Sequence, residues 1–145
     1  MSKLAAAPVS SVAVRELAAA VVRAERAPLR ALSITFVGPA RIRFLNKKHL
    51  GHGRETDVIA FSLTPPAALP APASGLVGDV YICPLVAARN ARAFGISARD
   101  EIRRLVIHGV LHVLGYDHPV GDARMASPMW RRQEHLLETL TGRAR

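Results

Sequence analysis

The chain has 145 residues, half of them hydrophobic, which suits one domain with a packed core and excludes a wholly disordered protein. Twenty Lys and Arg against eleven Asp and Glu give a net charge of +9, which attracts polyanions, although a solvated Arg-rich surface explains it equally well. The single cysteine, Cys83, excludes an intrachain disulfide, and no apolar run approaches the ~20 residues that span a bilayer, so we expect a cytoplasmic protein.

Helix and strand signals alternate in the first part of the chain. A serine cap and an apolar stripe predict a helix over residues 10–27. Alternating apolar residues predict a strand over residues 32–36, and a short basic helix is expected over residues 41–48. Residues 49–55 contain two glycines and are expected to form a loop, and residues 57–62 are expected to form a second strand.

The second part of the chain is mostly helical. Residues 64–74 are rich in Pro and Ala and predict a surface loop, and residues 77–83 predict a third strand. Helices are expected over residues 85–94, over residues 97–115 with Ser97 as cap, and over residues 124–140. This order predicts an α+β fold in which the whole chain forms one compact domain, with a small mixed sheet packed against helices.

Three of the six histidines, His108, His112 and His118, fall within eleven residues. His108 and His112 are four residues apart, so on a helix they lie on one face, one turn from each other. Gly115 allows the chain to reverse with a positive φ and bring His118 back as a third ligand. Three imidazoles and one open position are typical of catalytic zinc, which lowers the pKa of its bound water to ~7. The spacing therefore predicts a zinc hydrolase with its metal site at a helix end.

The histidine spacing also matches the H-E-x-x-H-x-x-G-x-x-H pattern of zinc peptidases, with one difference. Gly109 stands where a peptidase carries the glutamate that serves as general base. Without that carboxylate, peptide hydrolysis has no evident proton carrier, so the sequence argues against a protease.

Several blocks together carry a resemblance to a known family. The segment His108–His118 reads H-G-x-L-H-x-x-G-Y-D-H, Thr56–Phe61 reads T-D-V-I-A-F after an earlier Leu-Asn pair, and Gly78–Ile82 reads G-D-V-Y-I. In this order they resemble the signatures of the YbeY family, the bacterial rRNA maturation factors. The resemblance implies a compact α+β fold, a metal held by the three histidines, and a single-strand-specific endoribonuclease. It further implies a role in 16S rRNA maturation and ribosome quality control, with rRNA, the small ribosomal subunit and assembly factors as partners; we expect neither DNA nor a membrane as partner.

One departure from the family pattern concerns a functional arginine. The family commonly has an aromatic residue followed by an arginine at the positions that hold His49 and Leu50 here. Arg54, in the same predicted loop, is our candidate for a catalytic replacement, and Asp117 is a candidate for orienting a ligand histidine or accepting a proton. Candidate substrate-binding residues on the basic helix are Arg41, Arg43, Lys47 and Lys48.

Two other classes of function remain open at this point. A non-catalytic ribosome-assembly or RNA-binding factor with structural zinc is compatible with the residues at positions 50 and 109. A peptidase or another small-substrate zinc hydrolase needs a carboxylate base from elsewhere in the chain. For the endoribonuclease, either water or the RNA 2′-hydroxyl can be the attacking group.

Overall fold

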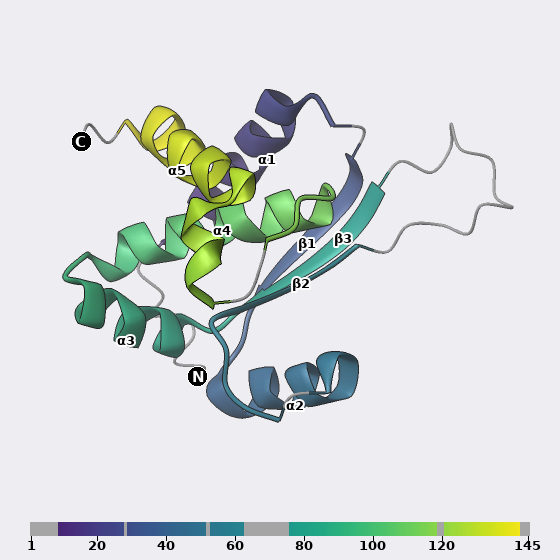
Figure 1. Cartoon of the computed structure of the whole chain (residues 1–145). Coiled ribbons are helices and arrows are strands. Elements are labelled where there is room, and N and C mark those ends of the chain that lie inside the picture. Colours follow the sequence, from purple (N-terminus) through teal and green to yellow (C-terminus); the bar gives the residue numbers. More distant parts are fainter. Residues whose placement is uncertain (1–8, 28, 52, 63–75, 119–120, 143–145) are drawn as a thin grey trace, which may run out of the picture.

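The structure is a computed structural model that describes residues 9–27, 29–51, 53–62, 76–118 and 121–142. Its elements follow the predicted order, with one additional short helix (Figure 1). In chain order they are α1 (Ser11–Glu25), β1 (Leu29–Phe36), α2 (Pro39–Leu50), β2 (Val58–Ser62), β3 (Leu76–Ile82), α3 (Pro84–Phe94), α4 (Ala98–Val113), the 3₁₀ helix η3 (Gly121–Ala126) and α5 (Pro128–Thr141).

The strands form a mixed sheet in the order β1-β3-β2. Central strand β3 pairs parallel with β1 and antiparallel with β2, so Val80 lies opposite Ile34 on one side and Ala60 on the other. Residues in register point to the same face of a sheet, and all three of these side chains pack in the larger hydrophobic core. The predicted α+β fold with a small mixed sheet is confirmed.

Helix α4 lies across this face of the sheet, and α1 and α5 pack against it (Figure 1). Ser97 caps it, because its Oγ accepts a hydrogen bond from the backbone N–H of Asp100 at 3.0 Å. Burial of each large aliphatic side chain contributes roughly 1.5–3 kcal/mol, which makes this helix the main source of core stability. Its buried aliphatic residues are Ile102, Leu105, Val106, Ile107, Val110, Leu111 and Val113.

Two glycines allow α4 and β3 to approach each other closely. A Cβ atom on Gly109 of α4 would lie 2.5 Å from Cγ1 of Val80, and one on Gly78 of β3 would lie 2.3 Å from Cγ1 of Val113. Both distances are well below van der Waals contact, so neither position accepts a side chain unless the helix or the strand moves. The helix that carries His108 and His112 is therefore seated directly on the central strand.

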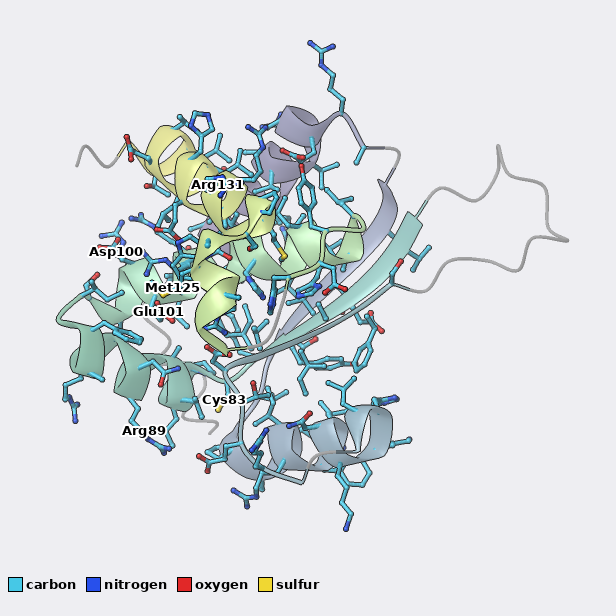
Figure 2. The ribbon with its side chains drawn as sticks, viewed as in Figure 1. Cys83, Arg89, Asp100, Glu101, Met125 and Arg131 are labelled. Atoms are coloured by element: carbon cyan, nitrogen blue, oxygen red, sulfur yellow. The ribbon has the colours of Figure 1, made fainter. Side chains whose placement is uncertain are left out.

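Helix α2 covers part of the opposite face of the sheet (Figure 1). Ile42 and Leu45 of α2 pack there against Ile59 of β2 in a second, smaller core. Cys83, at the start of α3, is fully buried in the same cluster (Figure 2). The sheet thus separates α2 from the layer of helices that contains the histidines.

Two predicted boundaries near the sheet are wrong. β1 begins at Leu29, earlier than the predicted 32–36, because pairing with β3 extends the strand beyond its alternating segment. α2 continues to Leu50, although residues 49–55 were expected to form a loop, since the helix stop is Gly51, whose φ is +77°. The predicted loop over residues 64–74 lies outside the described residues.

The last predicted helix, over residues 124–140, is divided in the structure. Residues 124–126 belong to η3, and α5 begins only at Pro128. The division occurs because Ser127 Oγ accepts a hydrogen bond from the N–H of Trp130 at 3.2 Å, and because proline favours the first turn of a helix. The remaining predicted elements agree with the structure to within two residues.

A hollow of about 800 Å³ lies between α1 and β1. Its lining is mainly apolar, with contributions from Val14, Val22, Leu32 and Phe36, and it includes none of the three histidines. No helix among the described residues is long and apolar enough to cross a bilayer.

Candidate metal centre

Three imidazole rings converge at the carboxyl-terminal end of α4. His108 and His112 stand one turn apart on the helix, and His118 returns toward them from the segment that follows. The centroid of the His108 ring lies 4.9 Å from that of His112 and 5.1 Å from that of His118, and the last two are 5.0 Å apart. One ligand nitrogen of each ring lies within 4.8 Å of the other two. The structure thus brings together the three predicted ligands.

This arrangement fits a tetrahedral metal ion. Bonds of 2.0–2.1 Å to zinc place neighbouring ligand nitrogens about 3.3 Å apart in a tetrahedron, so movements of less than about 1 Å per ring bring all three to the ion. Small rotations of the side chains supply such movements. Three imidazoles leave the fourth position of a tetrahedral ion open for water or substrate.

The turn after α4 determines the position of His118. Gly115 has φ +107°, a conformation that favours glycine, and its N–H donates to the carbonyl of His112 at 3.0 Å. Asp117 Oδ1 accepts a hydrogen bond from the backbone N–H of His118 at 2.8 Å. The chain reversal predicted at Gly115 is confirmed, and the exposed Asp117 stabilises the backbone of the turn.

The same turn is fastened to two other helices. The hydroxyl of Tyr116 donates to Glu25 Oε1 at 2.6 Å, and Nε of Arg132 donates to Glu25 Oε2 at 2.6 Å. Glu25 belongs to α1 and Arg132 to α5, and the Glu25 side chain is only 9% exposed. The hydrogen bond to Glu25 raises the pKa of Tyr116 above its ordinary value. The loop that carries His118 is therefore anchored to both helices.

A buried amide contacts the first histidine. His108 Nδ1 lies 2.6 Å from Oε1 of Gln133, a residue of α5 that is 1% exposed. Gln133 occupies the apolar stripe of its helix, between Met129 and Leu137. A polar residue in an apolar stripe is the one sequence signal that could have identified Gln133 beforehand.

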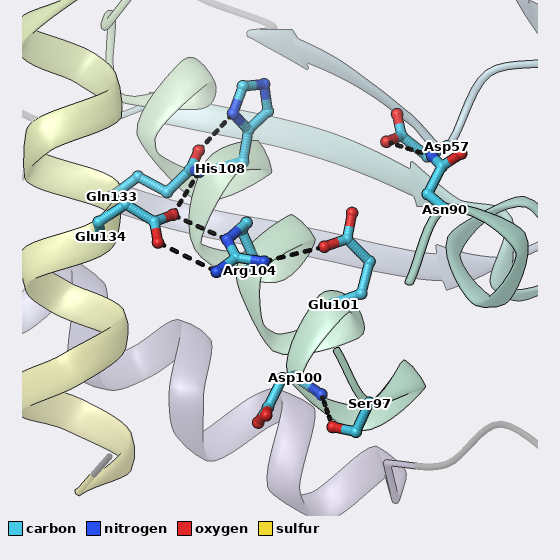
Figure 3. Close-up of polar contacts among 9 residues, drawn as sticks. All are labelled: Asp57, Asn90, Ser97, Asp100, Glu101, Arg104, His108, Gln133 and Glu134. Atoms are coloured by element: carbon cyan, nitrogen blue, oxygen red, sulfur yellow. Dashed lines mark hydrogen bonds and ion pairs between the residues drawn. The ribbon is translucent and has the colours of Figure 1, made fainter. Parts of the chain in front are cut away.

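Behind Gln133 a chain of charged groups continues away from the histidines (Figure 3). Gln133 Nε2 donates to Glu134 Oε2 at 3.0 Å. Arg104 donates to both oxygens of Glu134, at 2.8 and 3.0 Å, and to Glu101 Oε1 at 3.0 Å. Burial by itself lowers the pKa of Arg104, but the bonds and charges of the two glutamates raise it overall, so the guanidinium stays charged.

The histidines are in a state that suits metal binding. Burial lowers the pKa of His108 to about 4, helped by the charges of His112 and His118. Burial also lowers the pKa of His112 below its ordinary value. A neutral imidazole is the form that offers a lone pair to a metal ion, so both rings are ready to act as ligands at pH 7.

Sequence reasoning did not identify the charge interactions of Asp57 and Arg124. Burial raises the pKa of Asp57, at the start of β2, while the charge of Arg124 in η3 opposes this shift. Arg124 also lowers the pKa of His108. Asn90 Nδ2 donates to Asp57 Oδ2 at 3.3 Å, which fixes that carboxyl group (Figure 3). Asp57 and Arg124 are far apart in sequence, so no local pattern pointed to their proximity.

Comparisons with known proteins agree with the geometry. The profile of the family described as Endoribonuclease YbeY matches residues 3–141. The chain belongs to the YbeY family. Similar relatives named Endoribonuclease YbeY include those of Thermotoga maritima, 32% identical over 77% of this chain and 68% of the relative, and of Thermobifida fusca, 40% identical over 76% and 72%. A solution structure of a Thermotoga maritima protein superposes with a TM-score of 0.59 at 30% identity, covering 89% of this chain and 79% of the other.

Leu50, where the resemblance led us to expect an arginine, is an exposed residue at the end of α2. Arg54, the predicted replacement, is exposed and follows α2 in the chain. Its backbone carbonyl accepts a hydrogen bond from Nδ2 of the buried Asn46 at 3.0 Å. Arg124, in contrast, acts on the site, because its charge is among those that lower the pKa of His108.

The predicted substrate-binding residues lie on α2, across the sheet from α4 (Figure 1). All four are exposed, and Arg43 forms an ion pair with Glu55 at 3.1 Å. Phe44 is 53% exposed, and the Arg41 guanidinium lies 5.5 Å and the Lys48 ammonium 5.8 Å from its ring centroid. The basic helix and the three histidines therefore occupy opposite faces of the sheet.

Proposed function

We propose that this chain is a metal-dependent endoribonuclease that cleaves single-stranded RNA. The observation that carries the proposal is the convergence of three imidazoles in a chain of the YbeY family. The proposed setting is 16S rRNA maturation and ribosome quality control, with rRNA, the small ribosomal subunit and its assembly factors as partners. The proposed cofactor is one zinc ion per chain, held by His108, His112 and His118.

Residues of the chain can hold the metal ion and keep its ligands in the neutral form. A zinc ion bound by the three histidines would supply Lewis-acid charge and a water of lowered pKa. Burial keeps His108 and His112 neutral, and Gln133 holds His108 in place. Direct attack by water and attack by the RNA 2′-hydroxyl differ in their products. A 2′,3′-cyclic phosphate would reject direct water attack, because it forms only when the 2′-hydroxyl attacks the phosphorus.

A cation is needed to stabilise the charge that develops on the phosphate. Arg54 and Arg124 are the two candidates in the proposed mechanism, and the influence of Arg124 on His108 favours Arg124. RNA cleavage by Arg54→Ala and by Arg124→Ala separates them, since the residue that acts on the phosphate is the one whose loss slows turnover. Cleavage by Arg54→Ala at the parent rate would remove Arg54 from the mechanism.

Asp117 remains a proposed proton acceptor or a group that orients a ligand histidine. Burial lowers the pKa of His112, and the charge of Asp117 opposes this shift, which supports an electrostatic contribution. The variant Asp117→Asn keeps the side-chain oxygen that accepts the hydrogen bond from His118. A changed pH profile of cleavage would support a role in proton transfer. An unchanged profile would limit the role of Asp117 to its hydrogen bond with the backbone of the turn.

We propose α2 as an RNA-binding surface, with contacts from Arg41, Arg43, Lys47 and Lys48. The exposed Phe44 ring between two cations supports this, because bases stack on exposed aromatic rings near positive charge. Each phosphate contact to a single strand contributes about −0.7 to the slope of log K against log salt concentration. Lys47→Ala and Lys48→Ala should each make the slope shallower by about that amount, and an unchanged slope would exclude the residue from the surface.

The second candidate is a non-catalytic, zinc-containing assembly or RNA-binding factor, which the loss of the family arginine at Leu50 favours. A peptidase is disfavoured, because Gly109 has no room for the missing glutamate beside Val80. His112→Ala discriminates between the first two functions. An endoribonuclease loses cleavage in this variant, while a structural zinc protein loses RNA binding or stability and shows no cleavage even in the parent.

The decisive experiment pairs elemental analysis with a cleavage assay on structured and unstructured RNA, with and without a chelator. The proposal expects about one zinc per chain, cleavage of unstructured RNA, and loss of cleavage on chelation that added zinc restores. Cleavage that persists in chelator after the metal has been removed would refute the metal-dependent mechanism.

A further inference from the structure

The contact between His108 and Gln133 specifies where the imidazole carries its hydrogen. His108 Nδ1 lies 2.6 Å from Gln133 Oε1, and an amide oxygen can only accept a hydrogen bond. The neutral ring must therefore carry its hydrogen on Nδ1, which leaves the lone pair on Nε2. Nε2 is then the nitrogen through which His108 can bind a metal ion.

This conclusion depends on the orientation of the Gln133 amide. If the amide were rotated by 180°, its NH₂ group would donate to Nδ1, and the hydrogen of the ring would move to Nε2. A ring in that form has no lone pair on the nitrogen that is free to face the metal. The direction of one buried amide thus decides whether His108 is a ligand.

The neighbouring ion pair determines that direction. Gln133 Nε2 donates to Glu134 Oε2 at 3.0 Å, and a carboxylate can only accept, so the NH₂ group must face Glu134. Two hydrogen bonds from Arg104 to the oxygens of Glu134, at 2.8 and 3.0 Å, orient the carboxylate. Gln133 is 1% exposed, so water has little access to replace either of its partners.

We propose that Gln133 is a positioning residue that selects the metal-binding tautomer of His108, and that the Glu134–Arg104 ion pair holds Gln133 in the required orientation. This extends the proposed metal site to a residue 25 positions away along the chain. The inference rests on the proposed function only for its consequence in catalysis, because the tautomer is a property of the metal-free protein.

The expected effect on metal affinity follows from what is general for groups that hydrogen-bond a ligand histidine. Removal of a group that hydrogen-bonds a ligand histidine typically weakens metal binding 10–100-fold. Gln133→Met preserves the length and apolar contacts of the side chain, cannot donate to Nδ1, and offers Nδ1–H only a weakly accepting thioether sulfur. We expect its zinc affinity to fall by that factor, and its thermal midpoint without metal to change little.

The test is nitrogen NMR of the His108 ring in metal-free protein at pH 7.5, with assignment by comparison with His108→Gln. We expect the Nδ1–H form in the parent and a shift toward Nε2–H in Gln133→Met. Glu134→Gln, which removes the charge but keeps the size, should give a mixture of the two forms. The exposed His135, on the same helix, supplies the matched control His135→Gln, which should leave the His108 signals unchanged.

Zinc affinity, measured by competition with a chromophoric chelator, completes the test. The proposal is overturned if the parent ring carries its hydrogen on Nε2, or if Gln133→Met keeps both the Nδ1–H form and the parent's affinity. Failure of the proposed function gives a different result, in which the parent shows the Nδ1–H form but binds no zinc or cleaves no RNA. The positioning role of Gln133 is confirmed when both the His108 tautomer and the zinc affinity change in Gln133→Met.

Discussion

The contact between α4 and β3 predicts that Gly109→Ala destabilises the protein. The new Cβ would lie 2.5 Å from Cγ1 and 3.1 Å from Cγ2 of Val80, which is fully buried and, being β-branched, has little freedom to rotate away. Overpacking of this kind costs about 3 kcal/mol, while the better helix propensity of alanine returns about 1 kcal/mol. The net loss in the free energy of unfolding is therefore about 2 kcal/mol.

Urea unfolding of the chelated protein measures this loss, and the thermal midpoint should fall by about 8 °C in a chain of this size. Val80→Ala removes both methyl groups that the new Cβ would meet, so it provides the matched background. In that background Gly109→Ala should lose most of its cost, giving a coupling energy of about 1–3 kcal/mol. An equal cost in both backgrounds would refute the packing argument, as would a stabilisation of the parent by about 1 kcal/mol.

Three smaller predictions concern other described contacts. Ser97→Ala removes the cap of α4 and should lower stability by about 1 kcal/mol in urea unfolding, whereas Ser97→Asp should retain it; equal losses would exclude the cap. Tyr116→Phe removes the hydrogen bond to the nearly buried Glu25 and should lower the free energy of unfolding by about 1–2 kcal/mol. Zinc binding in competition titrations should also weaken, and an unchanged stability and affinity would show that this contact does not support the site. Folding lowers the pKa of His108 from 6.5 to about 4, because the ring is buried. The unfolded chain therefore binds a proton at this ring more readily than the folded protein does. As the pH falls from 6.5 toward 4, the free energy of unfolding should decrease by at most about 3 kcal/mol. Chemical unfolding of metal-free protein across this pH range should show a smaller loss in His108→Asn, and identical profiles would contradict the lowered pKa.

The metal ligands were predictable because their geometry is local. His108 and His112 need only the helical repeat, and Gly115 needs only its conformational freedom to return His118. The serine cap of α4 and the alternating strands were accessible for the same reason, since each pattern lies within one element. These signals are independent of how the elements pack.

The residues that support the ligands were not predictable in this way. Gln133 reaches His108 from another helix, and Arg124 acts on both His108 and Asp57 from η3, so only tertiary packing reveals these relations. The starting point of α5 was missed although its signal, Ser127 followed by proline, is local. The prediction of one continuous helix over residues 124–140 passed over the cap within it.

Hydrogen bonds link the segment that carries the three imidazoles to two other helices. His108 is held to α5 through Gln133, and the segment with His118 is held to α1 through Tyr116. An ion shared by the rings would therefore join α4 to the segment after it within a framework that α1 and α5 also hold. At a concentration 1,000 times its Kd it would add about 4 kcal/mol to the free energy of unfolding. The amount of intact protein in a cell would then follow the supply of that ion, because metal-poor chains unfold more often and are degraded sooner.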